Sequence, residues 1–160
     1  MTNQMLLASG ALFILTLIIL LFYRTSAEQS SVSLENDAML AASGLAQSLI
    51  AEIQKRSFDE ITVSKYIDST DSLTSATELG PEDDELFLTQ YDDVDDFNGY
   101  SVVDSSTKLG QYKLSVSVDY ISDMDPNTIS VSKTYNKMVM VAVTSMYLSD
   151  SLKLYHIVGY

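Results

Sequence analysis

The chain has 160 residues, of which 46% are hydrophobic and 19% are charged, and its formal net charge is −13. A strongly negative chain repels nucleic-acid phosphates, so we expect no nucleic-acid partner. The sequence contains no cysteine, which excludes disulfides, thiolate metal ligands and cysteine nucleophiles.

An uncharged apolar segment begins the chain. Residues from Met5 to Tyr23 would form a helix about 28 Å long, close to the ~30 Å hydrocarbon thickness of a bilayer. A cleavable secretory signal has a basic region before a shorter apolar stretch, and residues 1–4 contain no Lys or Arg. We therefore predict that residues 1–24 form a helix that lies in a membrane or in the apolar core of a filament.

The charge beside this segment bears on its orientation. The nearest basic residue, Arg24, follows the segment, and a positive-inside count would place the rest of the chain in the cytoplasm. We expect the opposite orientation, set by a short basic leader that processing removes before Met1.

The helical pattern continues beyond the apolar segment. Between Arg24 and Phe58 the sequence has no Pro and one Gly, and apolar residues recur at intervals of three and four. We predict one helix from near residue 2 to near residue 56, with residues 25–58 as its amphipathic continuation. The apolar stripe of this half consists of Val32, Met39, Ala42, Leu45, Ala46, Leu49, Ile50 and Ile53.

Residues 59–160 are predicted to form an acidic globular head. No Lys or Arg occurs between Lys65 and Lys108, whereas twelve Asp or Glu residues fall in that interval. One surface of the head is therefore expected to be strongly negative. Residues 62–77 are rich in Ser, Thr and Asp, which favours a surface loop.

Four strands are predicted after the acidic region. Residues 112–120 alternate between apolar and polar, so Tyr112, Leu114, Val116, Val118 and Tyr120 should face the core. Residues 137–145 are apolar on both faces and suit a central strand, while residues 99–103 and 152–158 supply a first and a last strand. Turn formers between the last three strands favour a meander. The predicted fold class is α+β, with a long N-terminal helix packed on an antiparallel β-sheet of about four strands.

This order of parts resembles type IV pilins and the pseudopilins of type II secretion systems. Two local stretches, residues 46–53 together with Phe58-Asp59-Glu60, and residues 91–100 with the sequence YDDVDDFNGY, look like minor pilins of the mannose-sensitive haemagglutinin pilus type. The resemblance implies anchoring in the inner membrane before assembly and handling by a pilus assembly machinery. It further implies a homo-oligomeric helical filament at the cell surface, with the heads exposed for adhesion.

One position departs from the pilin pattern. Pilins usually carry Glu at the fifth mature position, where it neutralises the N-terminal amine of a neighbouring subunit, and the fifth residue here is Met5. Two explanations stay open: Asn3 or Gln4 serves the amine by hydrogen bonding, or the subunit occupies a special place in its filament. Small residues around Gly10 would let neighbouring helices approach closely. The residues expected to take part in assembly are Met1, Met5, Gly10, Leu17 and Leu21.

Two acidic stretches are candidate calcium sites. The first crowds four carboxylates into five residues, and a divalent cation would relieve their repulsion. The second places oxygen ligands at alternate positions, as in the first half of a calcium loop, but Thr128 and Thr134 stand where an EF-hand has Gly and Glu. The alternatives are an ordinary solvated loop and a plain turn. The candidate ligands are Asp92, Asp93, Asp95 and Asp96 in the first stretch and Asp123, Asp125 and Asn127 in the second.

The sequence shows no catalytic motif. It has no G-x-S-x-G elbow, Walker loop or H-E-x-x-H, and its one histidine, His156, lies in the last predicted strand without a second His or a Cys. We therefore expect no enzymatic activity and no cofactor other than the candidate calcium. Two alternatives to a bulk filament subunit remain: a minor pilin or type II secretion pseudopilin, and a single-pass membrane-anchored extracytoplasmic binding module.

Overall fold

The computed structural model describes residues 2–160, with side chains described from residue 3 onward. The chain folds into one long N-terminal helix and a four-stranded antiparallel sheet, which confirms the predicted α+β class. It divides into two compact units, residues 1–37 and residues 38–160, and each is described by itself below.

The first unit is the N-terminal part of helix α1, which spans Thr2–Ile53. Its large apolar side chains between Met5 and Tyr23 are 44% to 75% exposed, so they occupy every face of the helix. The two hydroxyls within this stretch bond to the helix backbone, Ser9 Oγ to the Leu6 carbonyl (3.0 Å) and Thr16 Oγ1 to the Leu12 carbonyl (2.8 Å). The helix is long and apolar enough to cross a membrane. Because the hydroxyls of Ser9 and Thr16 bond to the helix backbone, they present no unsatisfied donor to an apolar environment.

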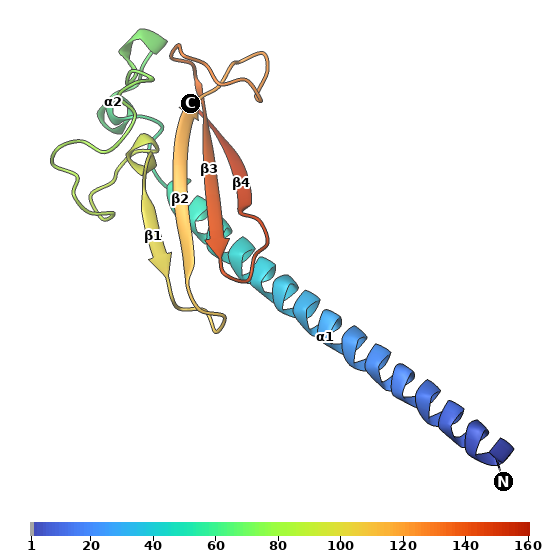
Figure 1. Ribbon diagram of the computed structural model, residues 1–160. Helices are drawn as coiled ribbons and strands as arrows, with labels where there is room; N and C mark the ends of the chain where they lie inside the picture. The colour runs from blue at the N-terminus through green and yellow to red at the C-terminus, as the bar shows by residue number, and fades with distance from the viewer. Residues whose placement is uncertain (1) are drawn as a thin grey trace. The chain divides into compact units, whose positions relative to one another are not determined.

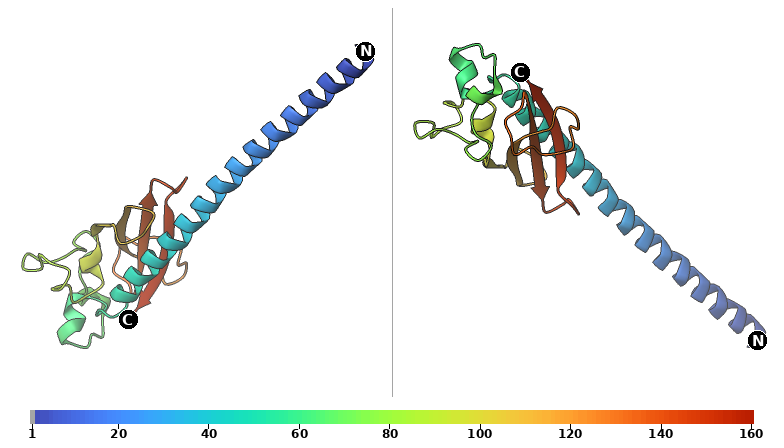
Figure 2. Two further views of the ribbon diagram at one scale, coloured as in Figure 1. Left: turned by 90° about the horizontal axis from the view of Figure 1, so that it is seen from below. Right: turned by 90° about the horizontal axis from the view of Figure 1, so that it is seen from above.

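The C-terminal turns of α1 belong to the second unit and pack on the sheet. Ala38, Ala42 and Ala46 recur every four residues and are fully buried, as is Ile53 at the helix end. Figure 2 shows these turns crossing one face of the sheet. The helix ends three residues before the predicted position, and the predicted stripe is partly wrong, because Val32 and Met39 are exposed while Leu45, Leu49 and Ile50 pack partly buried against the core.

Four strands form the sheet in the order β1-β2-β3-β4 (Figure 1). Their bounds are Ser101–Asp104 for β1, Tyr112–Tyr120 for β2, Asn136–Ser145 for β3 and Leu152–Gly159 for β4. Every neighbouring pair is antiparallel, which confirms the predicted meander. Each strand lies within two residues of its predicted bounds.

The core lies between α1 and the inner faces of β2 and β3. The five residues of β2 predicted to face the core are all buried. On β3 the inward residues are Lys137, Val139, Val141 and Val143, while the outward residues Met138, Met140 and Ala142 are half-buried. In the register, Val139 pairs with Val118 and Val141 with Val116, so apolar side chains meet across the two central strands.

The segment between α1 and β1 wraps one end of the sheet. It contains the short helix α2 (Glu60–Ser64) and two 3₁₀ turns, η1 (Thr70–Ser72) and η2 (Asp95–Phe97). Residues 62–77, predicted to be a surface loop, contain the end of α2 and η1, and they bury Ile67 and Leu73 in a small second core. This core also holds Phe58, which follows α1, and Tyr120 from β2, so the loop is packed against the sheet.

Candidate functional site

The two stretches that carry the local resemblance lie side by side. Ser57 and Asp93 form a parallel bridge, in which the Ser57 amide donates to the Asp92 carbonyl and the Val94 amide donates to the Ser57 carbonyl, both at 3.0 Å. The Phe58-Asp59-Glu60 turn and the YDDVDDFNGY segment are thus parts of one structure at the end of the sheet.

Ring contacts hold the YDDVDDFNGY segment together, and a hydrogen bond of Asn98 attaches it to β2. Phe97 is fully buried and meets the rings of Tyr91 and Tyr100 edge to face, with ring centroids 5.2 Å and 6.1 Å away. The Asn98 amide group donates to the Leu79 carbonyl (2.9 Å) and accepts from the Val118 amide (3.1 Å). The next residue, Gly99, has φ of 80°, a conformation that favours glycine.

A buried ammonium group lies beneath this segment. Lys137 on β3 is fully buried, and its Nζ pairs with Asp59 at 2.9 Å and Asp95 at 2.5 Å and donates to the Phe58 carbonyl at 2.8 Å. The same ammonium lies 4.6 Å from the centroid of the Phe58 ring and 5.2 Å from that of Tyr120. We call Lys137, Asp59 and Asp95 the lysine network.

The carboxylates of this network experience opposing effects. Burial raises the pKa of Asp59, but the charge and hydrogen bond of Lys137, helped by donors from Thr74 and Tyr120, outweigh it and lower the pKa below its usual range. At Asp95, burial exceeds the attraction of Lys137, so its pKa is raised. One ammonium group is thus shared by two buried carboxylates whose pKa values shift in opposite directions.

Asp93 lies beside the network without a cation of its own. Burial and the neighbouring carboxylates of Asp95 and Asp96 raise its pKa to about 9, so the group holds a proton at neutral pH. Its Oδ1 accepts from the amides of Asp95 (2.7 Å) and Asp96 (3.2 Å), which forms a local turn that leads into η2. Asp93 is thus a turn-forming residue.

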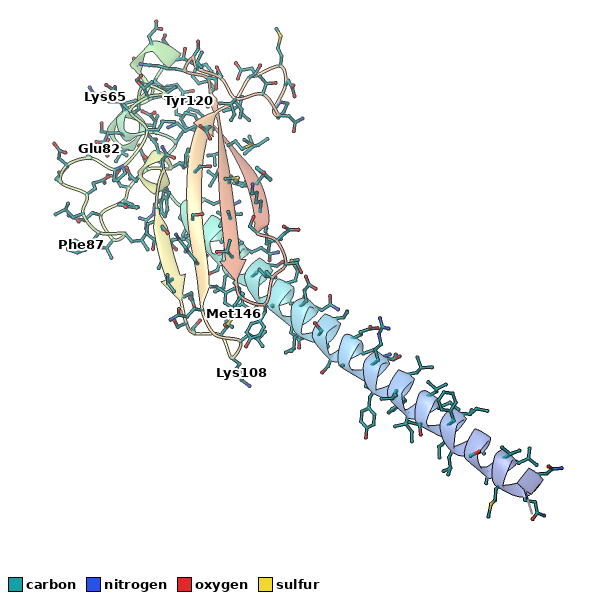
Figure 3. All side chains as sticks on the ribbon, viewed as in Figure 1. Lys65, Glu82, Phe87, Lys108, Tyr120 and Met146 are labelled. Atoms are coloured by element: carbon teal, nitrogen blue, oxygen red, sulfur yellow. The ribbon has the colours of Figure 1, made fainter. Side chains whose placement is uncertain are left out.

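A second group of carboxylates forms where the loop after Gly80 reaches η2. Glu82, Glu85 and Asp96 each offer an oxygen, and these oxygens all lie within 4.8 Å of one another; we call them the acidic cluster. Figure 3 labels Glu82 on this loop. Burial and the carboxylates of Asp96 and Glu82 raise the pKa of Glu85 to about 8, and burial raises the pKa of Glu82. The cluster can hold shared protons or a cation.

The four aspartates predicted as a calcium site separate in the structure. Asp92 is exposed, Asp93 forms the turn that leads into η2, Asp95 pairs with Lys137, and Asp96 joins the acidic cluster. Their repulsion is relieved partly by the buried lysine. Because Asp93, Asp95 and Asp96 are buried, the head surface is less negative than the sequence indicates.

The second predicted calcium stretch forms a turn. Asp125 accepts from the Asn127 amide (3.0 Å) and from Thr128 Oγ1 (2.8 Å), and Asp123 accepts from the Asn136 side chain (2.8 Å). All three candidate ligands, Asp123, Asp125 and Asn127, are exposed. Asp125 and Asn127 thus make a local turn contact, whereas Asp123 contacts the first residue of β3.

Four residues of these sites were not predicted as site residues, and one of them, Asp59, entered only through the stretch that carries the resemblance. Glu82 and Glu85 lie in the acidic run after Pro81, and their spacing of three, within one turn, was the available signal. Lys137 was assigned to an apolar strand, but its burial was not predicted. Its position two residues before Val139, on the same face of the strand, was the signal that it is buried.

The residues predicted to act in assembly lie on the first unit. Met5, Leu17 and Leu21 are exposed, and a Cβ added to Gly10 would meet no described atom within 4 Å beyond its chain neighbours and the adjacent helix backbone. Met1 lies outside the described residues. Spacings of seven and four place Gly10, Leu17 and Leu21 on one face of the helix.

The single histidine has a structural partner. His156 on β4 lies with its Nε2 2.9 Å from the side-chain nitrogen of Gln54, just after α1. This contact ties β4 to the end of the helix.

No family model matches the chain, and comparisons with curated proteins and with solved structures found no match.

Proposed function

We propose that this chain is a structural subunit of an extracellular type IV pilus-like filament. Its apolar N-terminal helix anchors it in the inner membrane before assembly and then bundles with the helices of other copies. The acidic head remains outside for contact with surfaces, and a pilus assembly machinery moves the subunit from membrane to filament.

The observation that supports this proposal most directly is the exposure of the apolar helix. An uncharged run from Met5 to Tyr23 with every large apolar side chain at least 44% exposed requires an apolar partner on all faces. Lipid and a bundle of like helices both provide one, which suits a subunit that passes from one to the other.

The head supplies a second argument. Its sheet packs on the C-terminal turns of the same helix that carries the apolar segment, so one continuous element joins the anchoring part to the folded part. A subunit that assembles through its helix needs this continuity, because the helix must carry the head into the filament.

Shearing of intact cells tests the proposal. The released material would be examined by electron microscopy and its 17.7 kDa protein identified by N-terminal sequencing. We expect filaments that contain this chain. Its abundance in that material distinguishes a bulk subunit from a minor pilin or a secretion pseudopilin. A chain that stays with the membrane, with filaments lacking it, would replace the proposal with a single-pass anchored binding module.

A further inference from the structure

We propose that the acidic cluster of Glu82, Glu85 and Asp96 is a binding site for a hard divalent cation, and that calcium is the cation that fits. The proposal does not depend on filament formation, because all three residues belong to the head.

The spacing of the oxygens supports this assignment. The three carboxylates each place an oxygen within 4.8 Å of the other two. Calcium binds oxygen ligands at about 2.3–2.6 Å, so oxygens that share one ion lie at most roughly 5 Å apart, and the three oxygens of the cluster meet this limit. Magnesium requires about 2.0–2.1 Å and a near-ideal octahedron, which a looser set of side chains fits less well.

Asp96 provides an independent observation. Asp96 is only 1% exposed. Its Oδ2 accepts hydrogen bonds from the backbone amides of Asp92 (2.9 Å) and Asp93 (3.0 Å). Its other oxygen, Oδ1, has no hydrogen-bond partner among the described residues, and neither does Glu82 Oε2. A buried carboxylate oxygen without a donor is unfavourable, and a cation would satisfy it.

The nearby lysine does not serve this cluster. The ammonium of Lys137 pairs with the carboxylates of Asp59 and Asp95. These two carboxylates outnumber the single ammonium group, so no lysine charge is left for the acidic cluster. Asp96 is held in place by two amides, so it acts as a fixed ligand, whereas half-buried Glu82 and Glu85 leave room for water to complete the coordination.

The site joins two separate parts of the chain. Glu82 and Glu85 lie on the loop that carries exposed Leu86 and Phe87, and Asp96 lies in η2. Phe87 points away from the head in Figure 3. A cation bound at the cluster would fasten this loop to the packed η2 turn and restrict its motion.

Calorimetric titration of the full chain in detergent, after removal of bound metal with a chelator, tests the site with calcium itself. We expect saturable binding of one ion and a melting temperature that rises with calcium. Glu85→Gln should weaken binding at least about tenfold, since affinity follows the charge of the ligand set. Asp84→Asn is the matched control, because Asp84 is exposed, adjacent and outside the cluster, and it should bind like the wild type.

Limited proteolysis gives a second measurement. Like the titration, it uses no substitution of the buried Asp96. Chymotrypsin cleaves after Leu and Phe, so we expect calcium to slow cleavage at residues 86–88 in the wild type and in Asp84→Asn, but not in Glu85→Gln. Equal binding by wild type and Glu85→Gln, or no calcium effect in either measurement, would overturn the proposal. Stabilisation by magnesium at lower concentrations than calcium would overturn the choice of ion.

Discussion

At the scale of single residues, the end of the head that carries the lysine network depends on one ammonium group. Lys137→Met keeps most of the side-chain volume but leaves Asp59 and Asp95 buried without a counter-charge. Removing one partner of a buried ion pair costs about 3–5 kcal/mol, and we expect a loss of that size in the free energy of unfolding at neutral pH. Urea or thermal unfolding of the purified chain in detergent would measure it.

The control for this variant is Lys153→Met. Lys153 is an exposed residue of β4, and its replacement should change the free energy of unfolding by less than about 0.5 kcal/mol. Equal losses in the two variants would show that the network adds nothing to the stability of the head.

Asp59 makes part of the stability depend on pH. Its pKa is lowered in the folded protein, so its contribution is complete above its ordinary pKa of about 3.9 and is lost as pH falls through the lower folded value. We expect the difference in unfolding free energy between wild type and Asp59→Asn to be largest at neutral pH and to shrink below about pH 4. Unfolding curves at several pH values give this difference.

The Asp59 comparison also requires a control for charge alone. Asp83→Asn removes one carboxylate at an exposed position and should leave the unfolding free energy close to wild type throughout the range. If the difference in unfolding free energy between wild type and Asp59→Asn does not change with pH, the role assigned to the Asp59 carboxylate is wrong.

The contacts of the lysine network could not be predicted from the sequence. Lys137 and Asp59 are 78 positions apart, and Lys137 and Asp95 are 42 apart. Local patterns contain no information on such pairings, because strand register and the path of the 54–100 segment decide them. The acidic composition of that segment was visible, but which carboxylates are buried was not.

At the scale of elements, the approach of α1 to the sheet relies on alanine. Ala46 is fully buried in the core, so Ala46→Leu must push the helix away from the sheet or force its neighbours out of their rotamers. We expect the free energy of unfolding to fall by about 1–3 kcal/mol. Gln47→Leu, at the next and exposed position, is the control and should be nearly neutral, and chemical denaturation of both variants makes the comparison.

Regular elements were predictable where one periodicity dominates. Strict alternation located β2 and its buried face, and the uninterrupted helical pattern located α1 to within a few residues of its end. Residues 62–77 show neither periodicity, so their two short helical turns and the burial of Ile67 and Leu73 could not be predicted. Ile67 and Leu73 are buried because Phe58 and Tyr120 offer apolar surface there.

At the scale of the whole molecule, the two units differ in what they need from their surroundings. The unit of residues 38–160 has its own buried core, whereas the described side chains of the first unit are almost all exposed. This division supports the proposed function, since one unit is complete by itself and the other requires lipid or other copies.

Gly10 tests the bundling part of the proposal. Beyond its chain neighbours and the adjacent helix backbone, no described atom lies within 4 Å of a Cβ added at Gly10, so Gly10→Leu should leave the melting temperature of the head unchanged. It should nevertheless reduce the mass of filaments in sheared material, because a large side chain blocks close approach of neighbouring helices. Gly10→Ala is the control and should assemble nearly as well as wild type. Normal filaments from Gly10→Leu would argue against tight packing at this position.

The buried position of Lys137 also bears on how the chain selects its strand register. A slip of β3 by one residue would turn Lys137 to the outer face of the sheet and bring Asn136 or Met138 to the carboxylates of Asp59 and Asp95. The slipped arrangement would still pair its backbone, and its many apolar residues would still be buried, but it would leave two acids without their counter-ion. In a strand whose apolar residues occupy both faces, the lysine is therefore the side chain that distinguishes the native alignment from its nearest competitor.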